Sequence, residues 1–425
     1  MQVTLKRVVV TGLGAITPLG NSTNEFWQAL LNGVSGAAPI TKFDATNFKT
    51  RFACEVKNYD SDAIFGRKES RKLDLFAQYG ISAADEAIAD AGLDRPEIDK
   101  NRVGVIFSSG IGGISTFQEQ LFDYWTQKQS NSLNARFNPF FIPKMILDIA
   151  AGHISIKYGF RGPNFAVVSA CASSTNALID AFTYLRLGRA NAIVVGGAEA
   201  SVIEAGVGGF SVMKALSERN DSPETASRPF DLNRDGFVLG EGAGAIILEE
   251  YEHAVNRGAT IYAEMIGGGM SADANHITAP HPEGLGAIMV MKDALQDAGI
   301  SPEDIDYINV HGTSTPLGDV SEAKAILNVF GEHAFKLNIS STKSMTGHLL
   351  GAAGAIEAIA SILAVKNDIV PPTINHFTDD PEFDPNLNFT FAKAQHRTVG
   401  AALSNTFGFG GHNASVIFKK ADITN

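Results

Sequence analysis

The sequence contains little cysteine, since only Cys54 and Cys171 occur in 425 residues. Two cysteines cannot build the disulfide framework of a small secreted protein, so we expect a reducing compartment. The first residues contain no apolar stretch followed by a small-residue cleavage site, and they lead directly into a strand-like run. These absences predict a cytoplasmic protein.

Positive charge is also scarce. Lysine and arginine number 34 against 46 aspartate and glutamate residues, which gives a net charge of -12. A nucleic-acid-binding protein needs a basic surface, so we exclude that function. The apolar runs of the sequence are shorter than the roughly 20 residues that a membrane helix requires, and we expect no membrane partner.

Short apolar runs separated by helical segments make up most of the chain, of which 44% is hydrophobic. Nearly continuous β-branched runs indicate strands covered on both faces, and their alternation with helices predicts an α/β fold with largely parallel sheets. The predicted strands lie at 7–11, 103–107, 166–169, 192–195, 242–248, 262–267, 305–310, 337–341, 401–404 and 414–418. The predicted helices lie at 82–91, 172–187, 287–298 and 348–365.

The second half of the chain repeats the plan of the first, which predicts an internal duplication. We place the N-terminal half at 1–255 and the C-terminal half at 256–425, with no low-complexity linker between them. The halves should therefore share one interface. The glycines at Gly12 and Gly14 lack the third glycine of a dinucleotide-binding fingerprint, because Thr17 stands there, and they predict a tight turn.

One cysteine lies where a reactive thiol is expected. Cys171 follows the apolar run that ends at Ser169 and opens a helix of small residues. The positive end of a helix dipole and its unpaired N–H groups favour a thiolate, so Cys171 is a candidate nucleophile. A packed core cysteine is the alternative that this segment alone leaves open. Cys54 has no such setting, and we expect it to fill space.

Two histidines also lie between a strand and the next element. His311 follows the apolar run at 305–310, and His348 follows the run at 337–341 with Lys343 five residues before it. One cysteine and two histidines on three loops admit a zinc site, a cysteine–histidine hydrolase or carbon–carbon bond formation on a thioester. Only the third chemistry uses all three side chains in separate roles.

Seven motifs then occur in order along nearly the whole chain: RVVVTGLGAITPLGNS, SSGIGG, SACASS, RPFDLNRDGFVLGEGAG, VHGTSTPLGD, SSTKSMTGHLLGAAG and SNTFGFGGHN. With them the chain resembles the elongating beta-ketoacyl-acyl carrier protein synthases, most closely the type II enzymes of dissociated fatty acid synthesis. The resemblance implies a thiolase-like fold, in which two duplicated α/β halves form five αβαβα layers and the active site lies where they meet. It also implies decarboxylative Claisen condensation that elongates an acyl chain by two carbons, with no redox cofactor.

The resemblance assigns catalytic roles to individual positions. Cys171 would accept the acyl chain, and the backbone N–H groups of Cys171 and Phe409 would form an oxyanion hole. His311 and His348 would bind the carbonyl of the malonyl thioester and stabilise the enolate that forms when CO2 leaves. Lys343 would tune the electrostatics around His348.

Other positions acquire supporting roles from the same resemblance. Phe407 and Phe409 would gate the acyl pocket, and Ile111 would line it near a homodimer interface. Glu357 would pair with Lys343 or hold a buried cation with Asn309 and Ser404. The partner would be acyl carrier protein, with its phosphopantetheine arm, docked on a basic patch made by Arg67, Lys68, Arg71, Lys72 and Lys214, with Arg136 beside it.

Two alternatives of related chemistry stay open. The nucleophile motif SACASS also occurs in polyketide ketosynthases, so a type II polyketide ketosynthase subunit is the main alternative. A silent dimer partner that only shapes chain length is the other, and the presence of Cys171 argues against it.

Overall fold

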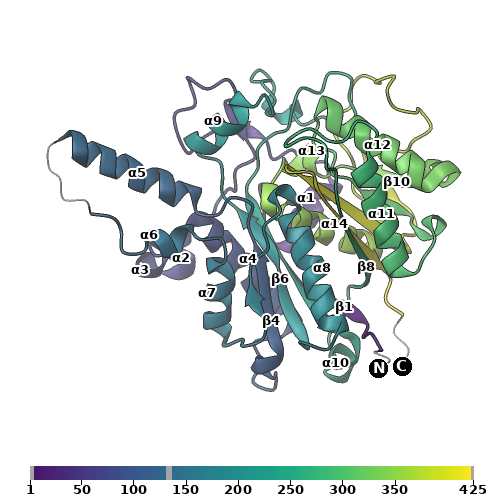
Figure 1. Ribbon diagram of the computed structural model, residues 1–425, viewed down its shortest axis with the longest axis horizontal. Helices are drawn as coiled ribbons and strands as arrows, with labels where there is room; N and C mark the ends of the chain where they lie inside the picture. The colour runs from purple at the N-terminus through teal and green to yellow at the C-terminus, as the bar shows by residue number, and fades with distance from the viewer. Residues whose placement is uncertain (1–3, 131–135, 423–425) are drawn as a thin grey trace.

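The computed structural model describes residues 4–130 and 136–422, and its main feature is a ten-stranded sheet (Figure 1). The order of the strands in the sheet is β10-β9-β13-β14-β8-β1-β7-β6-β4-β5. Their bounds are β1 Val8–Ile16, β4 Val103–Ser108, β5 Asn164–Phe165, β6 Ala192–Glu199, β7 Gly242–Glu250, β8 Ala263–Ala272, β9 Tyr307–Asn309, β10 Asn338–Ser340, β13 Ala401–Gly408 and β14 His412–Lys419. The short strands β2 (Ala38–Pro39) and β3 (Phe52–Ala53) form one small ladder, and β11 (Ile369–Val370) and β12 (Gln395–His396) form another.

Helices occupy most of the remaining chain. Their bounds are α1 Thr23–Leu31, α2 Ser61–Phe65, α3 Arg67–Ser70, α4 Leu75–Ala91, α5 Ile114–Gln129, α6 Phe141–Met145, α7 Ile149–Tyr158, α8 Ser173–Arg186, α9 Glu204–Val212, α10 Tyr251–Asn256, α11 Leu285–Ala298, α12 Pro316–Phe330, α13 Lys343–Thr346 and α14 Ala353–Asn367. The 3-10 turns η2 (Ala170–Ala172) and η6 (Leu350–Ala352) lead directly into α8 and α14.

The sheet consists of two halves with the same internal order. From the centre outwards, β1, β7, β6, β4 and β5 of the first half correspond to β8, β14, β13, β9 and β10 of the second. The halves join where β1 pairs antiparallel with β8 at Val8–Met265, Val9–Glu264 and Val10–Ala263. The predicted duplication is therefore visible in the topology, and the division at 255/256 stays a proposal about folding units.

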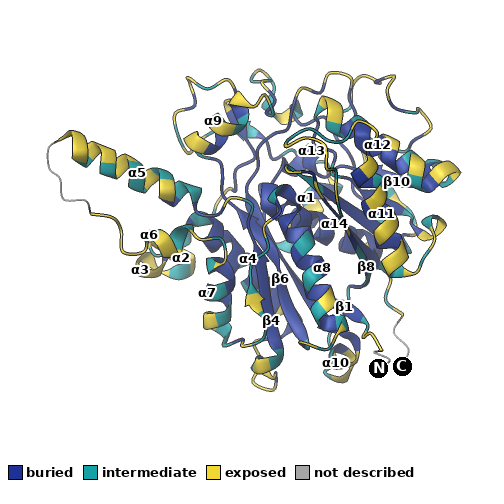
Figure 2. Ribbon diagram, viewed as in Figure 1, coloured by how far each residue is buried: buried dark blue, intermediate teal, exposed yellow. Residues whose placement is uncertain are grey.

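The helices form layers on both sides of these strands. α4 and α7 cover the outer face of the first half, and α11 and α12 cover that of the second. Between the halves lie α8 and α14, which contact each other and strands of both halves. Figure 2 shows α14 as almost wholly buried. This arrangement confirms the predicted α/β fold with duplicated halves and five layers.

Small residues let the layers approach closely. A Cβ atom on Gly354 of α14 would lie 2.0 Å from Thr175 Oγ1 of α8, and one on Gly14 of β1 would lie 1.9 Å from the Ala83 carbonyl oxygen of α4. Gly12 and Gly14 thus lie inside a strand, not in the predicted turn. Their role is to bring helix α4 against the backbone of β1.

Several other expectations were wrong in detail. The sheet is parallel only at β4–β5, β4–β6, β9–β10 and β9–β13, and antiparallel pairs join its centre. Residues 166–169 form no strand, because the chain leaves the sheet after β5 to enter the turn before α8. Helices α5 and α12 were not predicted.

One helical stretch, Leu350–Asn367, is long and apolar enough to cross a membrane by length and composition. Its most apolar window is 89% buried within the protein, however, so it is the central helix of the core. Its high hydropathy reflects burial on all sides.

Candidate active site

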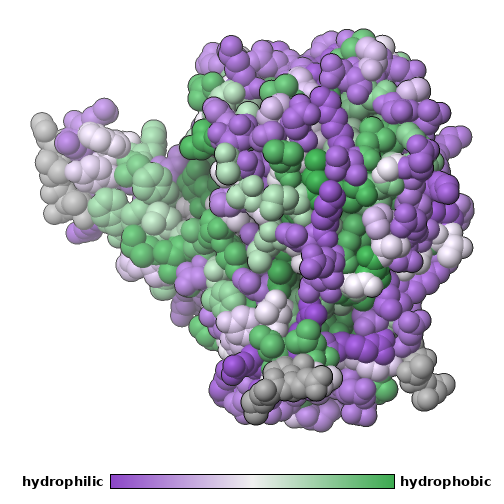
Figure 3. Space-filling model, turned by 45° about the vertical axis from the view of Figure 1, so that its right-hand side comes forward, coloured by the Kyte–Doolittle hydropathy of each residue, from purple (hydrophilic) through white to green (hydrophobic). Residues whose placement is uncertain are grey.

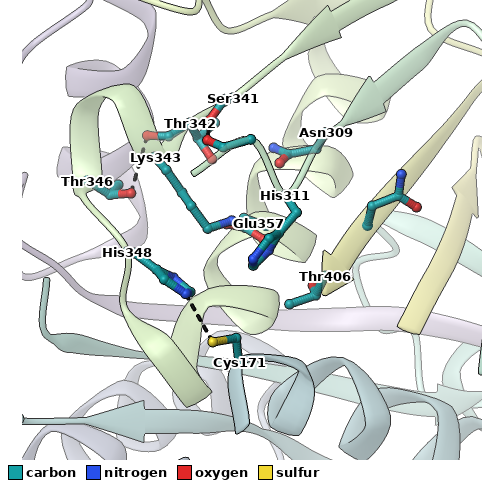
Figure 4. Close-up of polar contacts among 12 residues, drawn as sticks. Cys171, Asn309, His311, Ser341, Thr342, Lys343, Thr346, His348, Glu357 and Thr406 are labelled. Carbon is teal, nitrogen blue, oxygen red and sulfur yellow. Dashed lines mark hydrogen bonds and ion pairs between the residues drawn. The ribbon is translucent and has the colours of Figure 1, made fainter. Parts of the chain in front are cut away.

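A cavity of about 590 Å³ lies where the two halves meet. Its lining includes seven of the predicted site residues, namely Ile111, Cys171, Lys214, His311, His348, Phe407 and Phe409. The cysteine comes from the turn before α8, and the two histidines come from the end of β9 and from the loop between α13 and α14. Figure 4 shows both imidazole rings directed toward Cys171.

The backbone turns sharply just before the cysteine. Ala170 has a φ of 51°, which is the left-handed region that few residues other than glycine adopt. This turn places Cys171 in the middle of η2 at the beginning of α8, with 7% of its surface exposed. The Ser173 hydroxyl donates a hydrogen bond of 2.7 Å to the Ala170 carbonyl and accepts one of 2.9 Å from the Ser169 N–H, which holds the turn.

The helix-end N–H groups lower the pKa of Cys171 as expected, but the expectation that they would prevail was wrong, because burial raises the pKa by more. Burial raises the pKa of the Cys171 thiol to about 12, and the Glu199 carboxylate acts in the same direction. Backbone N–H groups of Phe409 and Cys171 and the ammonium of Lys343 oppose that rise. Desolvation outweighs these donors because a buried thiolate loses its water, so Cys171 is a neutral thiol at neutral pH.

His348 is the immediate partner of this thiol. Its Nε2 lies 3.1 Å from Cys171 Sγ, and the ring is 3% exposed (Figure 4). Burial lowers the pKa of His348 well below its ordinary value, and Lys343 adds to that effect. A neutral imidazole beside a neutral thiol means that the S–H donates its hydrogen bond to Nε2.

His311 is fixed through its backbone. Its N–H donates a 2.9 Å hydrogen bond to Glu322 Oε1, and the Gly312 N–H donates one of 2.8 Å to Oε2. The His311 and His348 rings are 5.2 Å apart at 88°. Burial, followed by Lys343 and His348, lowers the pKa of His311 well below its ordinary value, so both rings are neutral.

Lys343 is a buried ammonium behind the histidines. It begins α13 and forms an ion pair with Glu357 of α14, and both side chains are almost fully buried. Burial raises the pKa of Glu357, whereas the adjacent ammonium opposes that rise. The pairing is one of the two arrangements that the resemblance implied for Glu357.

Two buried residues near the histidines were missed in the sequence. Glu322 holds the loop of His311, and burial raises the pKa of its carboxyl to about 7, although the N–H groups of Gly312 and His311 oppose this. Asn405 donates a 3.2 Å hydrogen bond from Nδ2 to Glu322 Oε1. A glutamate on the buried face of α12, eleven residues after the histidine, was the available signal.

The predicted gate lies at the end of β13, which contains Phe407, and in the turn after it, which contains Phe409. Phe409 is half-buried and packs 6.5 Å from the Phe210 ring, whereas Phe407 lies 5.7 Å from the His311 ring. Gly410 and Gly411 have φ values of 88° and 74°, which only glycine adopts without strain. Ile111 is 36% exposed and lines the same cavity.

The predicted docking residues separate into two places. Lys68, Arg71, Lys72 and Arg136 line one surface groove of about 580 Å³ together with Phe137 and Phe140. Arg67 is exposed on α3 outside that lining, and Lys214 is exposed at the cavity that contains Cys171. The expected helical face is interrupted, since α3 ends at Ser70 and Lys72 bends back to pair with Glu69 at 2.7 Å.

Three buried oxygen atoms belong to the residues that the resemblance implied as cation ligands. Asn309 Oδ1, Glu357 Oε2 and Ser404 Oγ have no hydrogen-bond partner within residues 4–130 and 136–422. Asn309 and Ser404 are register partners on the neighbouring strands β9 and β13. Buried oxygen atoms that accept no hydrogen bond can serve as ligands of a hard cation such as an alkali metal ion.

A thiol and two neutral imidazoles at the junction of duplicated α/β halves define a condensing enzyme of thiolase-like fold. Residues 5–254 match Beta-ketoacyl synthase, N-terminal domain, and residues 262–377 match Beta-ketoacyl synthase, C-terminal domain. The chain therefore belongs to the beta-ketoacyl synthase family, as its motifs predicted.

Curated relatives agree with this assignment. The chain is 47% identical to 3-oxoacyl-(acyl-carrier-protein) synthase 2 of Coxiella burnetii, over 98% of this chain and 99% of the relative. It is 48% identical to the protein of that name from Synechocystis, over 98% of both chains, and 49% identical to that from Staphylococcus aureus strain COL, again over 98% of both.

Solved structures agree with the fold. A ketosynthase complex with its type II polyketide acyl-carrier protein and hexaketide, AntDE:AntF, has a TM-score of 0.91 at 35% identity, over 98% of this chain and 100% of that chain. A beta-ketoacyl synthase from Burkholderia phymatum STM815 has a TM-score of 0.89 at 35% identity, with the same coverage.

Acid should destabilise the protein through its two buried histidines. Their native pKa values lie below the ordinary 6.5, so the unfolded chain binds more protons. The two histidines alone should therefore lower the free energy of unfolding as the pH drops below about 6.5, by roughly 1.4 kcal/mol per pH unit each, whereas the raised pKa values of Glu322 and Glu357 act in the opposite direction. Urea unfolding of the wild type and of the His348→Asn variant, at a pH about one unit above and about one unit below this value, isolates the contribution of one histidine. The variant should lose less stability on acidification than the wild type, and an equal loss would contradict the assignment.

Proposed function

We propose that this protein extends a fatty acyl chain on Cys171 by two carbons, using malonyl-acyl carrier protein and releasing CO2. The contact of 3.1 Å between Cys171 Sγ and His348 Nε2, with His311 in the same cavity, is the observation that carries the proposal. The comparisons favour this chemistry over the zinc site and the hydrolase that the residues alone left open.

Acyl transfer is the first step. The thiol proton passes to His348 Nε2 as the sulfur attacks the thioester carbonyl of acyl-acyl carrier protein. Backbone N–H groups of Cys171 and Phe409 are placed to receive the developing negative oxygen, since both act on the sulfur in the resting site. The carrier thiol leaves with the proton, so His348 returns to its neutral form.

Condensation is the second step. The ring proton of His348 moves to Nε2 once Cys171 is acylated and no longer donates to that nitrogen. The malonyl thioester then loses CO2, and the enolate oxygen accepts hydrogen bonds from the neutral rings of His311 and His348. Low pKa values keep these rings neutral, so they act as hydrogen-bond donors without adding charge. The enolate carbon attacks the acyl carbonyl, the bond to Cys171 breaks, and one proton from solvent restores the thiol.

The buried cation is proposed as a structural element. Asn309, Glu357 and Ser404 would hold it, and it would fix the strands β9 and β13 and orient Glu357 toward Lys343. Replacing sodium and potassium by a bulky organic cation should lower the melting temperature of the wild type. The same exchange should have no effect in a Ser404→Ala, Asn309→Leu variant, and an unaffected wild type would contradict the cation.

The groove at Lys68, Arg71, Lys72 and Arg136 is proposed as the docking surface for acyl carrier protein. An acidic carrier would meet basic side chains there on an enzyme of net charge -12, which orients it by attraction. Lys214, at the cavity itself, would meet the phosphate of the phosphopantetheine arm.

A second copy of this chain is proposed to cover the arm formed by α5. The arm stands out from the body (Figure 1), and Figure 3 shows apolar surface along it. Phe122 is 71% exposed, Trp125 51% and Val168 56%, and β5, which ends three residues before Val168, is an edge strand of the sheet. Exposed aromatic residues and an unpaired sheet edge favour a homodimer. Sedimentation equilibrium tests this, and a monomer at micromolar concentration would refute it.

The fatty acid pathway is favoured over the polyketide alternative by similarity. Relatives named 3-oxoacyl-(acyl-carrier-protein) synthase 2 share 47% to 49% identity, whereas the type II polyketide structure shares 35%. A product profile with a matched carrier protein distinguishes the two. Addition of one two-carbon unit to a fully reduced acyl chain supports the fatty acid pathway. Repeated addition of two-carbon units without reduction supports the polyketide pathway.

Replacing Cys171 with glutamine should separate the two chemical steps. Without the sulfur, no acyl enzyme forms, so condensation should fall to background. The histidines stay in place, so release of CO2 from malonyl-acyl carrier protein should persist or rise. Radiolabelled CO2 and product thioester, measured in the same reaction, test both outcomes. A variant that still condenses would end the proposal.

Reversing charge in the groove should weaken carrier binding without touching the chemistry. For the Lys68→Glu, Arg71→Glu variant, we expect KM for acyl-acyl carrier protein to rise by about tenfold or more. Acylation of Cys171 by a small acyl thioester should stay unchanged. Lys324→Glu, on the exposed face of α12, is the matched control. An equal effect in control and variant would locate docking elsewhere.

A further inference from the structure

Glu199 is a fully buried carboxylate at the end of β6, with 0% of its surface exposed. Its hydrogen-bond donors are all neutral. They are the Gly110 N–H (2.8 Å), the Ile111 N–H (3.1 Å), the Gly112 N–H (3.3 Å), the Gly351 N–H (3.0 Å), the Ser109 hydroxyl (3.0 Å) and the Ser201 hydroxyl (3.5 Å). Among the described residues, no basic side chain forms an ion pair with it.

The two oxygen atoms of Glu199 are surrounded by hydrogen-bond donors, most of them main-chain N–H groups. Burial raises the pKa of Glu199, and the backbone donors at Gly351, Gly110 and Ile111 act against that rise. Glu199 is thus a buried carboxyl group held mainly by the main chain.

These contacts bind two walls of the active-site cavity together. The donors at 109–112 belong to the turn after β4 that carries Ile111, and Gly351 belongs to the turn after His348. Ile111 and Leu350 both line the cavity that contains Cys171. A Cβ atom on Gly351 would lie 2.1 Å from the Gly110 nitrogen, so the two turns touch through their backbones.

The hydrogen bond between Glu199 and Gly351 lies at the position of the second half that is equivalent to Cys171 in the first. Leu350 has a φ of 48° and opens η6 before α14, as Ala170 with 51° opens η2 before α8. Gly351 therefore stands in the second half where Cys171 stands in the first. The Glu199 carboxylate accepts the N–H of that position at the beginning of the 15-residue helix α14.

We propose that Glu199 is a positioning residue that sets acyl-chain length. By holding the 109–112 turn against the turn after His348, it fixes where Ile111 lines the cavity and so sets the depth of the acyl pocket. The inference rests on the proposed condensing function. Chain-length preference would then depend on the main-chain contacts that hold the Ile111 turn in place.

The test is the Glu199→Gln variant. Its amide NH2 group takes the place of one carboxyl oxygen, so a donor faces the main-chain N–H donors and those hydrogen bonds are lost. Intact-mass measurement of acyl transfer to Cys171 is made with a short and a long saturated acyl thioester. We expect the rate ratio of long to short chain to fall by about tenfold. Release of CO2 from the malonyl thioester, which needs no acyl pocket, should stay near the wild-type rate.

Glu249→Gln is the matched control, because Glu249 is equally buried on the adjacent strand β7 but pairs with Arg257. Its ratio should equal that of the wild type. If Glu199→Gln does not fold, the same rate ratio of long to short chain is measured in Glu199→Asp. That variant keeps the carboxyl group on a side chain one methylene shorter. An unchanged ratio, or an equal change in the control, overturns the inference. A wild type that accepts neither thioester refutes the proposed function instead.

Discussion

Close packing of the two central helices brings the thiol of Cys171 within reach of His348. α8 and α14 begin with equivalent turns, and small residues at their contact, such as Gly354 against Thr175, let the turns approach. A larger side chain there would move the sulfur and the imidazole apart, because they belong to different halves of the chain. The reactive pair therefore depends on the packing of apolar helices as much as on polar residues.

Burial governs the electrostatics of the site in the same way. It keeps the thiol and both imidazoles neutral and leaves Lys343 beside Glu357 as the nearby ion pair. A site made of neutral groups in a region of low dielectric interacts weakly with a neutral ground state and strongly with charge that appears during reaction. In the proposed reaction the enolate and the tetrahedral oxyanion would be such charges, and their donors would be in place before they form.

Much of this could be predicted from the sequence, and the limits have physical causes. Cys171, His311 and His348 each follow an apolar run, and that local pattern sufficed to place them at element ends. The predicted direction of the pKa shift of Cys171 was wrong because helix-end donors are visible in a sequence, whereas desolvation depends on the whole fold. Glu199 was missed because its partners lie 87 to 152 positions away. The arm at α5 was missed because its exposed aromatic residues resemble a buried face.

The equivalence of the two turns points to a history of divergence. An ancestral single unit that dimerised would have presented the same turn twice, on either side of a twofold axis. After fusion into one polypeptide, each copy was released from the requirement to be identical. One turn retains a sulfur nucleophile at Cys171, and the other has Gly351, without a side chain, sealed by a carboxylate. Gly351, the position equivalent to Cys171, thus became part of the backbone framework of the active-site cavity.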